Sequence, residues 1–184
     1  LFGKKKDYDY RYNAPERIVR AGIRQLSLGA LLGLGNWRSD VAALFDHLSW
    51  LMNRYPGVEY SLSFPRIRQL TDWEFEHERV SDQDIVKVIC AARILFPRVD
   101  INISTRESQE FRDNILPLGV TKMSAGSLTT VGGYSDSENI TEGQFAIDDD
   151  RDLEDMKQML LKRGFDPVLT SWRAIENSSR ISVK

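Results

Sequence analysis

The sequence contains a single cysteine, Cys90, and only two histidines among its 184 residues. A lone cysteine excludes an internal disulfide and any metal centre that takes several cysteine ligands from this chain. We therefore expect no metal site built from this chain. Because disulfide-rich chains belong to oxidising compartments, the low cysteine usage favours a cytoplasmic location.

An excess of charge of one sign is also lacking. Lysine and arginine number 25 against 27 aspartate and glutamate residues, which gives a formal net charge of -2. This balance offers no electrostatic footprint for nucleic acid or for an anionic membrane. No apolar run approaches the roughly 20 residues that a membrane-spanning helix needs. We therefore expect neither nucleic acid nor a membrane as a partner.

Glycine-rich phosphate motifs are missing as well. The nearest candidate is the segment 29–35, but apolar residues separate its glycines. A dinucleotide fingerprint needs Gly-x-Gly-x-x-Gly on a turn from a strand to a helix, and a phosphate-binding Walker pattern does not occur either. The sequence therefore does not favour a nucleotide site of either kind.

The spacing of the apolar residues predicts helices that alternate with strands. Asn13 is expected to cap the first helix, and Ser81 with Asp84 resembles a capping box at the third. The predicted helices cover 13–22, 39–54, 81–96, 111–116 and 153–163, and the predicted strands cover 25–28, 58–64, 99–104, 120–124 and 167–169.

The connections between these strands are too long for hairpins, so the expected fold class is α/β with a parallel sheet. The spacing favours half of a (β/α) barrel over a doubly wound sheet, because a complete eight-fold barrel needs roughly 250 residues. We expect residues 1–184 to form a single domain. The start at Leu1 resembles neither an initiator nor a signal peptide, so we expect this domain to be part of a longer protein.

Small polar residues follow the predicted strands, at 103–107 and 123–127, and Gly132-Gly133-Tyr134 follows soon after. The carboxyl ends of parallel strands are the place where α/β enzymes carry their chemistry. The pattern is therefore typical of an enzyme.

Five side chains at these strand ends are candidates for substrate binding. Arg106 offers a planar fork suited to a carboxylate, although an ion pair with a nearby acid is the more typical explanation of such a residue. Ser104 and Thr105 either bind a ligand or cap a helix. Ser124 and Ser127 flank Ala125-Gly126, where small residues allow close approach to a ligand or merely form a tight turn.

Other polar residues have both a functional and a structural interpretation. Arg66 and Arg68 follow a predicted strand and either face the same edge of the sheet or are solvated. His47 is more typical of helix packing than of catalysis, and His77 is more typical of a solvated loop than of metal binding. The run 148–150 either holds a hard cation or complements the N-terminus of the helix that follows.

Seven ordered motifs resemble the aromatic amino-acid lyases of the radical S-adenosylmethionine class, over nearly the whole chain. The similarity is greatest to the tyrosine lyases of thiazole and thiamine biosynthesis, the 2-iminoacetate synthases. It implies the C-terminal half of a radical S-adenosylmethionine (β/α) barrel with the biotin and thiamin synthesis associated region. The motifs are Asn13-Ala14-Pro15-Glu16-Arg17, 29–34, Ser63-Phe64-Pro65-Arg66, Ser104-Thr105-Arg106-Glu107, Ser124-Ala125-Gly126-Ser127, Gly132-Gly133-Tyr134 and Gln144-Phe145.

The resemblance implies that the whole enzyme cleaves the Cα–Cβ bond of tyrosine by 5′-deoxyadenosyl radical chemistry, giving 2-iminoacetate and p-cresol. It implies S-adenosylmethionine and a [4Fe-4S] iron–sulfur cluster as cofactors, with the three cysteine ligands in the family's other half. The fragment alone is then expected to be inactive. The implied substrate-binding residues are Arg106, Ser104, Thr105, Ser124 and Ser127, and the implied residues near S-adenosylmethionine are Gly29, Gly33, Ser63 and Arg66.

The implied partners are tyrosine, the N-terminal half of the same enzyme and the thiazole synthase protein. We also expect a sheet edge left open by the missing strands, which either a second copy of the fragment would cover, forming a homo-oligomer, or rearranged helices would cover.

Three alternatives remain at this point. The tyrosine-cleaving maturase of iron-only hydrogenase shares the motifs, but that family carries a cysteine-containing C-terminal extension, whereas 164–172 lacks cysteine and is similar to the thiazole-pathway ending. A tryptophan lyase is possible because the absent half can select the substrate ring. A third class is a noncatalytic module that binds an amino acid or docks to a partner.

Overall fold

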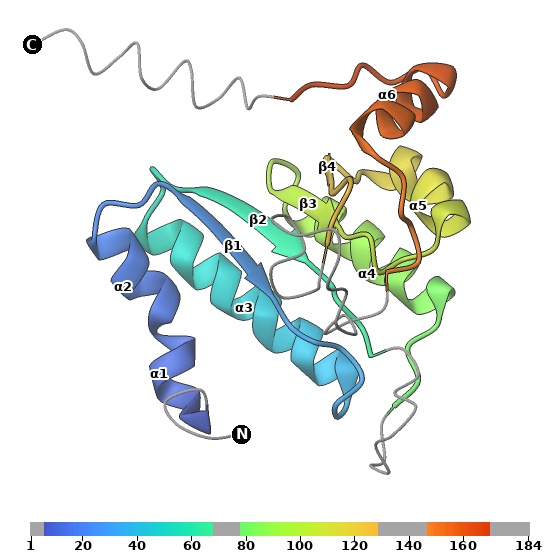
Figure 1. The fold of residues 1–184 in the computed structure, drawn as a ribbon. Helices are drawn as coiled ribbons and strands as arrows, with labels where there is room; N and C mark the ends of the chain where they lie inside the picture. The colour runs from blue at the N-terminus through green and yellow to red at the C-terminus, as the bar shows by residue number, and fades with distance from the viewer. Residues whose placement is uncertain (1–5, 68–77, 129–146, 170–184) are drawn as a thin grey trace, which may run out of the picture.

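The computed structural model describes residues 6–67, 78–128 and 147–169, and it is built around one parallel sheet (Figure 1). Its strands lie side by side in the order in which they occur along the chain, and every pairing is parallel. The strands are β1 (Gln25–Gly29), β2 (Glu59–Ser63), β3 (Asp100–Ile103) and β4 (Lys122–Met123).

Helices connect the strands. The long helices α3 (Trp37–Arg54) and α4 (Asp82–Leu95) link β1 to β2 and β2 to β3, and α5 (Gln109–Ile115) precedes β4. The remaining helical elements are α1 (Tyr8–Tyr12), α2 (Ala14–Arg20), the short 3-10 helix η2 (Leu116–Leu118) and α6 (Leu153–Lys162). A strand order without reversal is that of a barrel segment, whereas a doubly wound sheet reverses at its switch point. The predicted α/β class and parallel sheet are confirmed.

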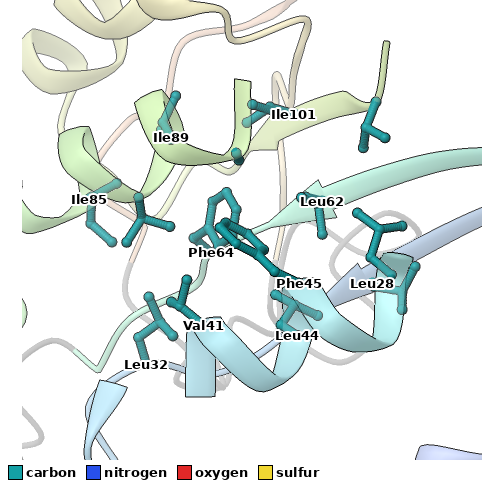
Figure 2. Close-up of a cluster of buried hydrophobic side chains, with 14 of the residues drawn as sticks. Leu28, Leu32, Val41, Leu44, Phe45, Leu62, Phe64, Ile85, Ile89 and Ile101 are labelled. Atoms are coloured by element: carbon teal, nitrogen blue, oxygen red, sulfur yellow. The ribbon is translucent and has the colours of Figure 1, made fainter. Parts of the chain in front are cut away.

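The core lies between the sheet and the helices α3 and α4 (Figure 2). Strand residues that alternate along the chain point into it, because successive side chains of a strand face opposite sides of the sheet. From the strands, Leu28, Leu62 and Ile101 meet helix residues such as Leu44 and Ile89, and all five are at most 9% exposed. This burial fixes which face of each strand is turned toward the helices.

Local signals explain where the long helices begin. The side chain of Asn36 accepts a hydrogen bond from the Ser39 amide at the start of α3. At α4 the predicted capping box is confirmed, since Ser81 and Asp84 bond each other's backbone amides. These bonds satisfy amide groups that the first turn of a helix leaves unpaired.

Two local predictions are wrong. Asn13 precedes α2, but its side chain makes no cap and instead donates to the Asp9 carbonyl, because the unpredicted helix α1 ends at the same residue. The segment 167–169 is not a strand; Val168 and Leu169 are 51% and 67% exposed. Its apolar residues find no sheet neighbour within the described part, and a strand forms only where a neighbour completes its hydrogen bonds.

The side of the sheet away from α3 and α4 is polar. Gln25, Ser27, Ser61 and Asn102 occupy the positions between the buried strand residues, and the Gln25 amide donates to Glu59 at 2.9 Å. Among the described residues β1 pairs only with β2, so the cover of its other edge by a second copy remains a prediction. Within 6–67, 78–128 and 147–169, no helix has the length and apolarity of a membrane span.

Candidate functional site

A cavity of about 410 Å³ lies at the carboxyl ends of β2, β3 and β4. It brings together residues predicted to act in substrate binding and in cofactor binding, from segments up to 64 positions apart, since Ser63 and Ser127 both line it. Seven of the nine predicted site residues belong to its lining: Ser63, Arg66, Ser104, Thr105, Arg106, Ser124 and Ser127.

Arg106 lies in the turn that directly follows β3 and is half-buried in the cavity wall. Its backbone amide donates to the Ser104 hydroxyl at 3.4 Å, and the Glu107 amide donates to the Ser104 carbonyl at 3.3 Å. Ser104 therefore shapes the turn that carries the Arg106 guanidinium. Its role in the turn is structural, and it also lines the cavity. Thr105 is buried at 3% exposure within the same wall.

Arg66 lines the cavity with its own charge already paired. Its Nε and Nη2 donate to the two carboxylate oxygens of Glu107 at 3.1 and 2.5 Å, and its Nη1 donates to the Val80 carbonyl at 2.9 Å. Burial by itself would lower the pKa of Arg66, but the Glu107 and Asp82 carboxylates outweigh it and raise the pKa above its ordinary value. A two-bond contact of this kind is strong and directional, so it ties the end of β2 to the end of β3.

Ser124 and Ser127 line the cavity beside the Arg106 turn, because they follow β4, which pairs with β3. The Ser124 amide donates to the Ile103 carbonyl at 3.2 Å, which continues the pairing of β3 with β4 beyond the strands. Gly126, between the two serines, has a φ of +56°, a conformation that glycine adopts at little cost. Its amide donates to the Arg151 carbonyl at 3.0 Å. The tight turn is real, and it presents both serines to the cavity.

Gly29 and Gly33 do not line the cavity. Gly29 lies close to Ser63, which does line it, and Gly33 bonds Glu78. A Cβ on Gly29 would lie 2.5 Å from the Ser63 hydroxyl oxygen and 2.8 Å from the Ser63 carbonyl oxygen, so glycine lets β1 approach Ser63. Gly33 has a φ of +103°, and its carbonyl accepts from the Glu78 amide at 2.9 Å. Direct ligand contact by either glycine remains a prediction.

Asn102 of β3 also lines the cavity, although the sequence analysis did not select it. It lies on the side of the sheet away from α3 and α4. The Asn102 side-chain amide nitrogen donates to the Ser61 hydroxyl at 3.3 Å and to the Ser27 hydroxyl at 3.5 Å. Its amide oxygen is buried and has no hydrogen-bond partner among the described residues. An unpaired buried acceptor is costly, so this amide is suited to a ligand donor. The sequence signal that could have identified Asn102 is its position between Ile101 and Ile103, two apolar residues of a strand.

Other sequence candidates lie elsewhere. His47 is buried on α3, where its ring stacks on Tyr12 with centroids 3.9 Å apart, and burial lowers its pKa. In the run 148–150, Asp149 is fully buried in ion pairs with Arg112 and Arg151, so it is available neither to a hard cation nor to the helix N-terminus. Four predicted features fall outside the described residues: Arg68, His77, Gly132-Gly133-Tyr134 and Gln144-Phe145.

Metal ligands do not gather in the described part of the chain. No three His, Cys, Asp or Glu side chains there could hold an ion together, and Cys90 lies half-buried in α4. Iron–sulfur clusters are held by several cysteine thiolates. This part of the chain therefore does not fit an iron–sulfur cluster.

A family model, the Biotin and Thiamin Synthesis associated domain, matches residues 63–166. Two curated proteins named 2-iminoacetate synthase are similar over 173 residues: one from Escherichia coli strain K12 at 42% identity and one from Salmonella typhimurium at 40%. Each match covers 94% of this chain and 46% of the relative. The chain thus spans about half the length of these curated relatives.

Solved structures of a related protein share the fold. The FeFe-hydrogenase maturase HydG from Carboxydothermus hydrogenoformans superposes with a TM-score of 0.81 at 33% identity, covering 94% of this chain and 39% of that one. A second HydG structure gives 0.82 at 32% identity, covering 92% and 37%. The resemblance drawn from the motifs and the predicted fold, the second half of a radical S-adenosylmethionine barrel, are both confirmed.

Proposed function

The chain belongs to the Biotin and Thiamin Synthesis associated domain family, and from this premise we propose that it forms part of a tyrosine lyase of thiamine biosynthesis. The complete enzyme would cleave the Cα–Cβ bond of tyrosine to give 2-iminoacetate and p-cresol. Residues 1–184 would act as a single domain together with the enzyme's other half in the cytoplasm. The thiazole synthase protein would be a further partner.

The cavity at the strand ends is the observation that carries this proposal. A zwitterionic amino acid needs a cation for its carboxylate, hydrogen-bonding groups nearby and a dry wall for its side chain. Arg106 supplies the cation, and Ser104, Ser124 and Ser127 supply hydroxyls around the same space. Ile85 and Ile89 of α4 contribute apolar wall, which would help to exclude water from reactive intermediates.

Arg106 would bind the tyrosine carboxylate through its planar fork. Glu107, the residue after Arg106, forms an ion pair with Arg66. Arg106 therefore does not have to neutralise the Glu107 carboxylate. Holding the amino acid at one end orients the bond to be broken, and orientation of this kind supplies much of an enzyme's rate.

S-adenosylmethionine with a reduced iron–sulfur cluster would supply the 5′-deoxyadenosyl radical. The cluster would be held outside the described part of this chain. Of the four residues proposed to lie near S-adenosylmethionine, Ser63 offers a hydroxyl in the cavity, and Gly29 allows β1 to approach it. Arg66 would act by keeping the ends of β2 and β3 together, since its nitrogens are bonded to Glu107, Val80 and Asp82.

The related maturase is the second candidate. Identity of 40–42% to the 2-iminoacetate synthases against 32–33% to HydG favours the thiamine enzyme. The test is turnover by the complete protein with S-adenosylmethionine, reductant and either tyrosine or tryptophan. We expect p-cresol and 5′-deoxyadenosine with tyrosine, a result that supports a tyrosine lyase of either family. Turnover of tryptophan alone would contradict the tyrosine assignment, and tyrosine binding without any cleavage would support the noncatalytic module.

A further inference from the structure

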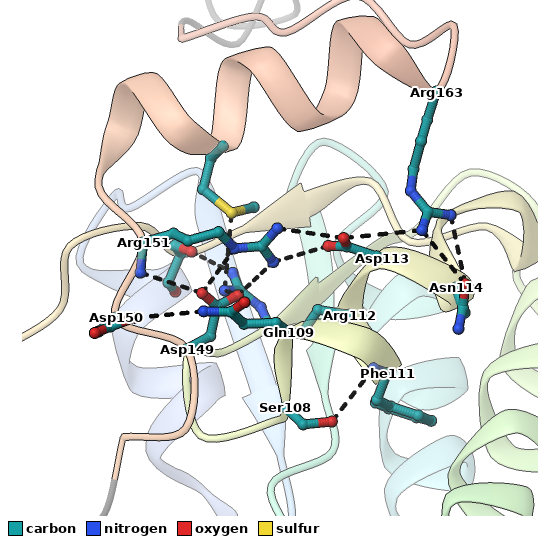
Figure 3. A network of polar contacts seen from close by, with 12 residues as sticks. Ser108, Gln109, Phe111, Arg112, Asp113, Asn114, Asp149, Asp150, Arg151 and Arg163 are labelled. Carbon is teal, nitrogen blue, oxygen red and sulfur yellow. Dashed lines mark hydrogen bonds and ion pairs between the residues drawn. The ribbon is translucent and has the colours of Figure 1, made fainter.

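A cluster of charged residues joins α5 to the segment before α6 (Figure 3). The Arg112 cluster, as we call it, consists of Arg112, Asp113, Asp149 and Arg151. Arg112 and Asp149 are both 0% exposed and form an ion pair. Arg151 bonds Asp149 at 2.6 Å and Asp113 at 2.8 Å. The segment before α6 is thereby fastened to α5.

The Arg112 cluster also bonds two segments that line the cavity. The Nη2 of Arg112 donates to the Ser124 carbonyl, and the Arg151 carbonyl accepts from the Gly126 amide. In the Arg106 turn, the Thr105 carbonyl accepts from the amides of Asp148 and Asp149 at 3.0 and 3.1 Å. The Arg112–Asp149 pair therefore joins the turn that carries Arg106 to the loop that carries Ser124 and Ser127, in addition to backbone bonds such as that from the Ser124 amide to the Ile103 carbonyl.

Burial acts on both charges of the central pair. It lowers the pKa of Arg112 despite the attraction of Asp149, and the Arg112 Nε has no hydrogen-bond partner among the described residues. Burial alone would raise the pKa of Asp149, but the hydrogen bonds from Arg151 and the charge of Arg112 outweigh it and hold the pKa below its ordinary value. Replacing a buried ion pair by apolar residues of similar volume is often neutral for stability. The bond from Arg112 to the Ser124 carbonyl gives this pair a directional contact with the cavity loop, beyond any contribution that it makes to stability.

We infer that Arg112 and Asp149 are positioning residues that set the distance between the Arg106 turn and the Ser124–Ser127 loop. The inference rests on the proposed function, since that distance would decide how well the amino acid's carboxylate and its neighbouring groups are held together. Misplacement of binding groups by about 1 Å is enough to cost roughly 100-fold in rate.

The experiment removes both charges while keeping the volume. In the complete enzyme, the double variant Arg112→Met with Asp149→Leu is compared with the wild type for thermal unfolding, tyrosine dissociation constant and amide hydrogen exchange. We expect a folded protein, a dissociation constant raised about 10- to 100-fold, and faster exchange in 104–107 and 122–127 but not in β1 and β2. A folded variant with unchanged tyrosine affinity and unchanged exchange would overturn the inference.

A second variant decides the matter if the double variant does not fold. Arg112→Lys keeps a charge beside Asp149, but a single ammonium does not reproduce the fork that also reaches the Ser124 carbonyl. Weakened tyrosine binding with normal folding would support positioning, and wild-type affinity would overturn it. Arg20→Lys is the matched control, because Arg20 is exposed on α2 and its partners Glu16 and Tyr55 are not members of the Arg112 cluster, and we expect no change.

Hydrogen exchange keeps the two proposals apart. If the wild-type enzyme does not bind tyrosine, the proposed function is wrong, but faster exchange in both strand-end segments of the Arg112 variants would still show that the cluster holds them. If tyrosine binds the wild type and both Arg112 variants equally, and exchange is unchanged, the positioning role is wrong while the proposed function stands.

Discussion

The two faces of the sheet differ sharply although the same strands build both. Toward α3 and α4 the strands present Leu28, Leu62 and Ile101, which are almost fully buried. Toward the other side they present polar residues such as Ser61 and Asn102, which bond one another. Parallel sheets packed on both faces are usually apolar throughout. The first face therefore carries the core, whereas the second face contributes Asn102 to the cavity at the strand ends.

The largest effect should come from the apolar face. Leu62→Ala removes a fully buried side chain, and we expect a loss of about 2–5 kcal/mol in the free energy of unfolding because a cavity is left in the core. The matched control is Ser61→Ala, its neighbour on the opposite face, with an expected loss of about 1 kcal/mol or less. Urea denaturation of both variants measures this, and equal losses would contradict the division between faces.

A smaller effect should come from the polar face. Asn102→Ala removes the unpaired amide oxygen that lines the cavity. We expect tyrosine affinity to fall by roughly 5- to 10-fold, as for one lost hydrogen bond, with little change in stability. Calorimetric titration of tyrosine, beside urea denaturation, measures both quantities. A large loss of stability with intact affinity would assign Asn102 to the structure instead.

The smallest effect on stability should come from His47, which is buried on α3. It tests whether burial keeps this side chain uncharged. Burial lowers its pKa in the folded state below the ordinary value near 6.5. The unfolded chain therefore binds the proton more readily, so stability is full above about pH 6.5 and is lost as pH falls through the folded pKa. In His47→Phe this part of the pH dependence should disappear. Identical stability profiles between pH 5 and 8 for variant and wild type would count against it.

Local signals and the geometry of parallel sheets explain what the sequence could predict. Ser81 and Asp84 stand three residues apart, so their capping box is visible without any tertiary contact. The strand ends that carry Arg106 and Ser124 meet because the carboxyl ends of neighbouring parallel strands share one edge. The sequence could therefore predict that these segments meet at one site although they are far apart along the chain.

Long-range pairing explains what the sequence could not predict. Arg66 and Glu107 are 41 positions apart, and Arg112 and Asp149 are 37 apart. Nothing local distinguishes Asp149 from a solvated acid before a helix, and the tertiary fold alone buries it against two arginines. For the same reason Arg66 resembled an available cation in sequence, although Glu107 occupies its fork.

The central claim is that the strand-end cavity binds an amino acid by its carboxylate, and Arg106 tests it most directly. In the complete enzyme, Arg106→Ala should weaken tyrosine binding by about 2–3 kcal/mol, roughly 30- to 150-fold, because a charge-assisted contact is lost. Cleavage of S-adenosylmethionine should be less affected, and Arg106→Lys should restore binding only in part. Tyrosine affinity is measured beside the yields of p-cresol and 5′-deoxyadenosine. Unchanged tyrosine affinity in Arg106→Ala would contradict the account and leave Arg106 a structural residue.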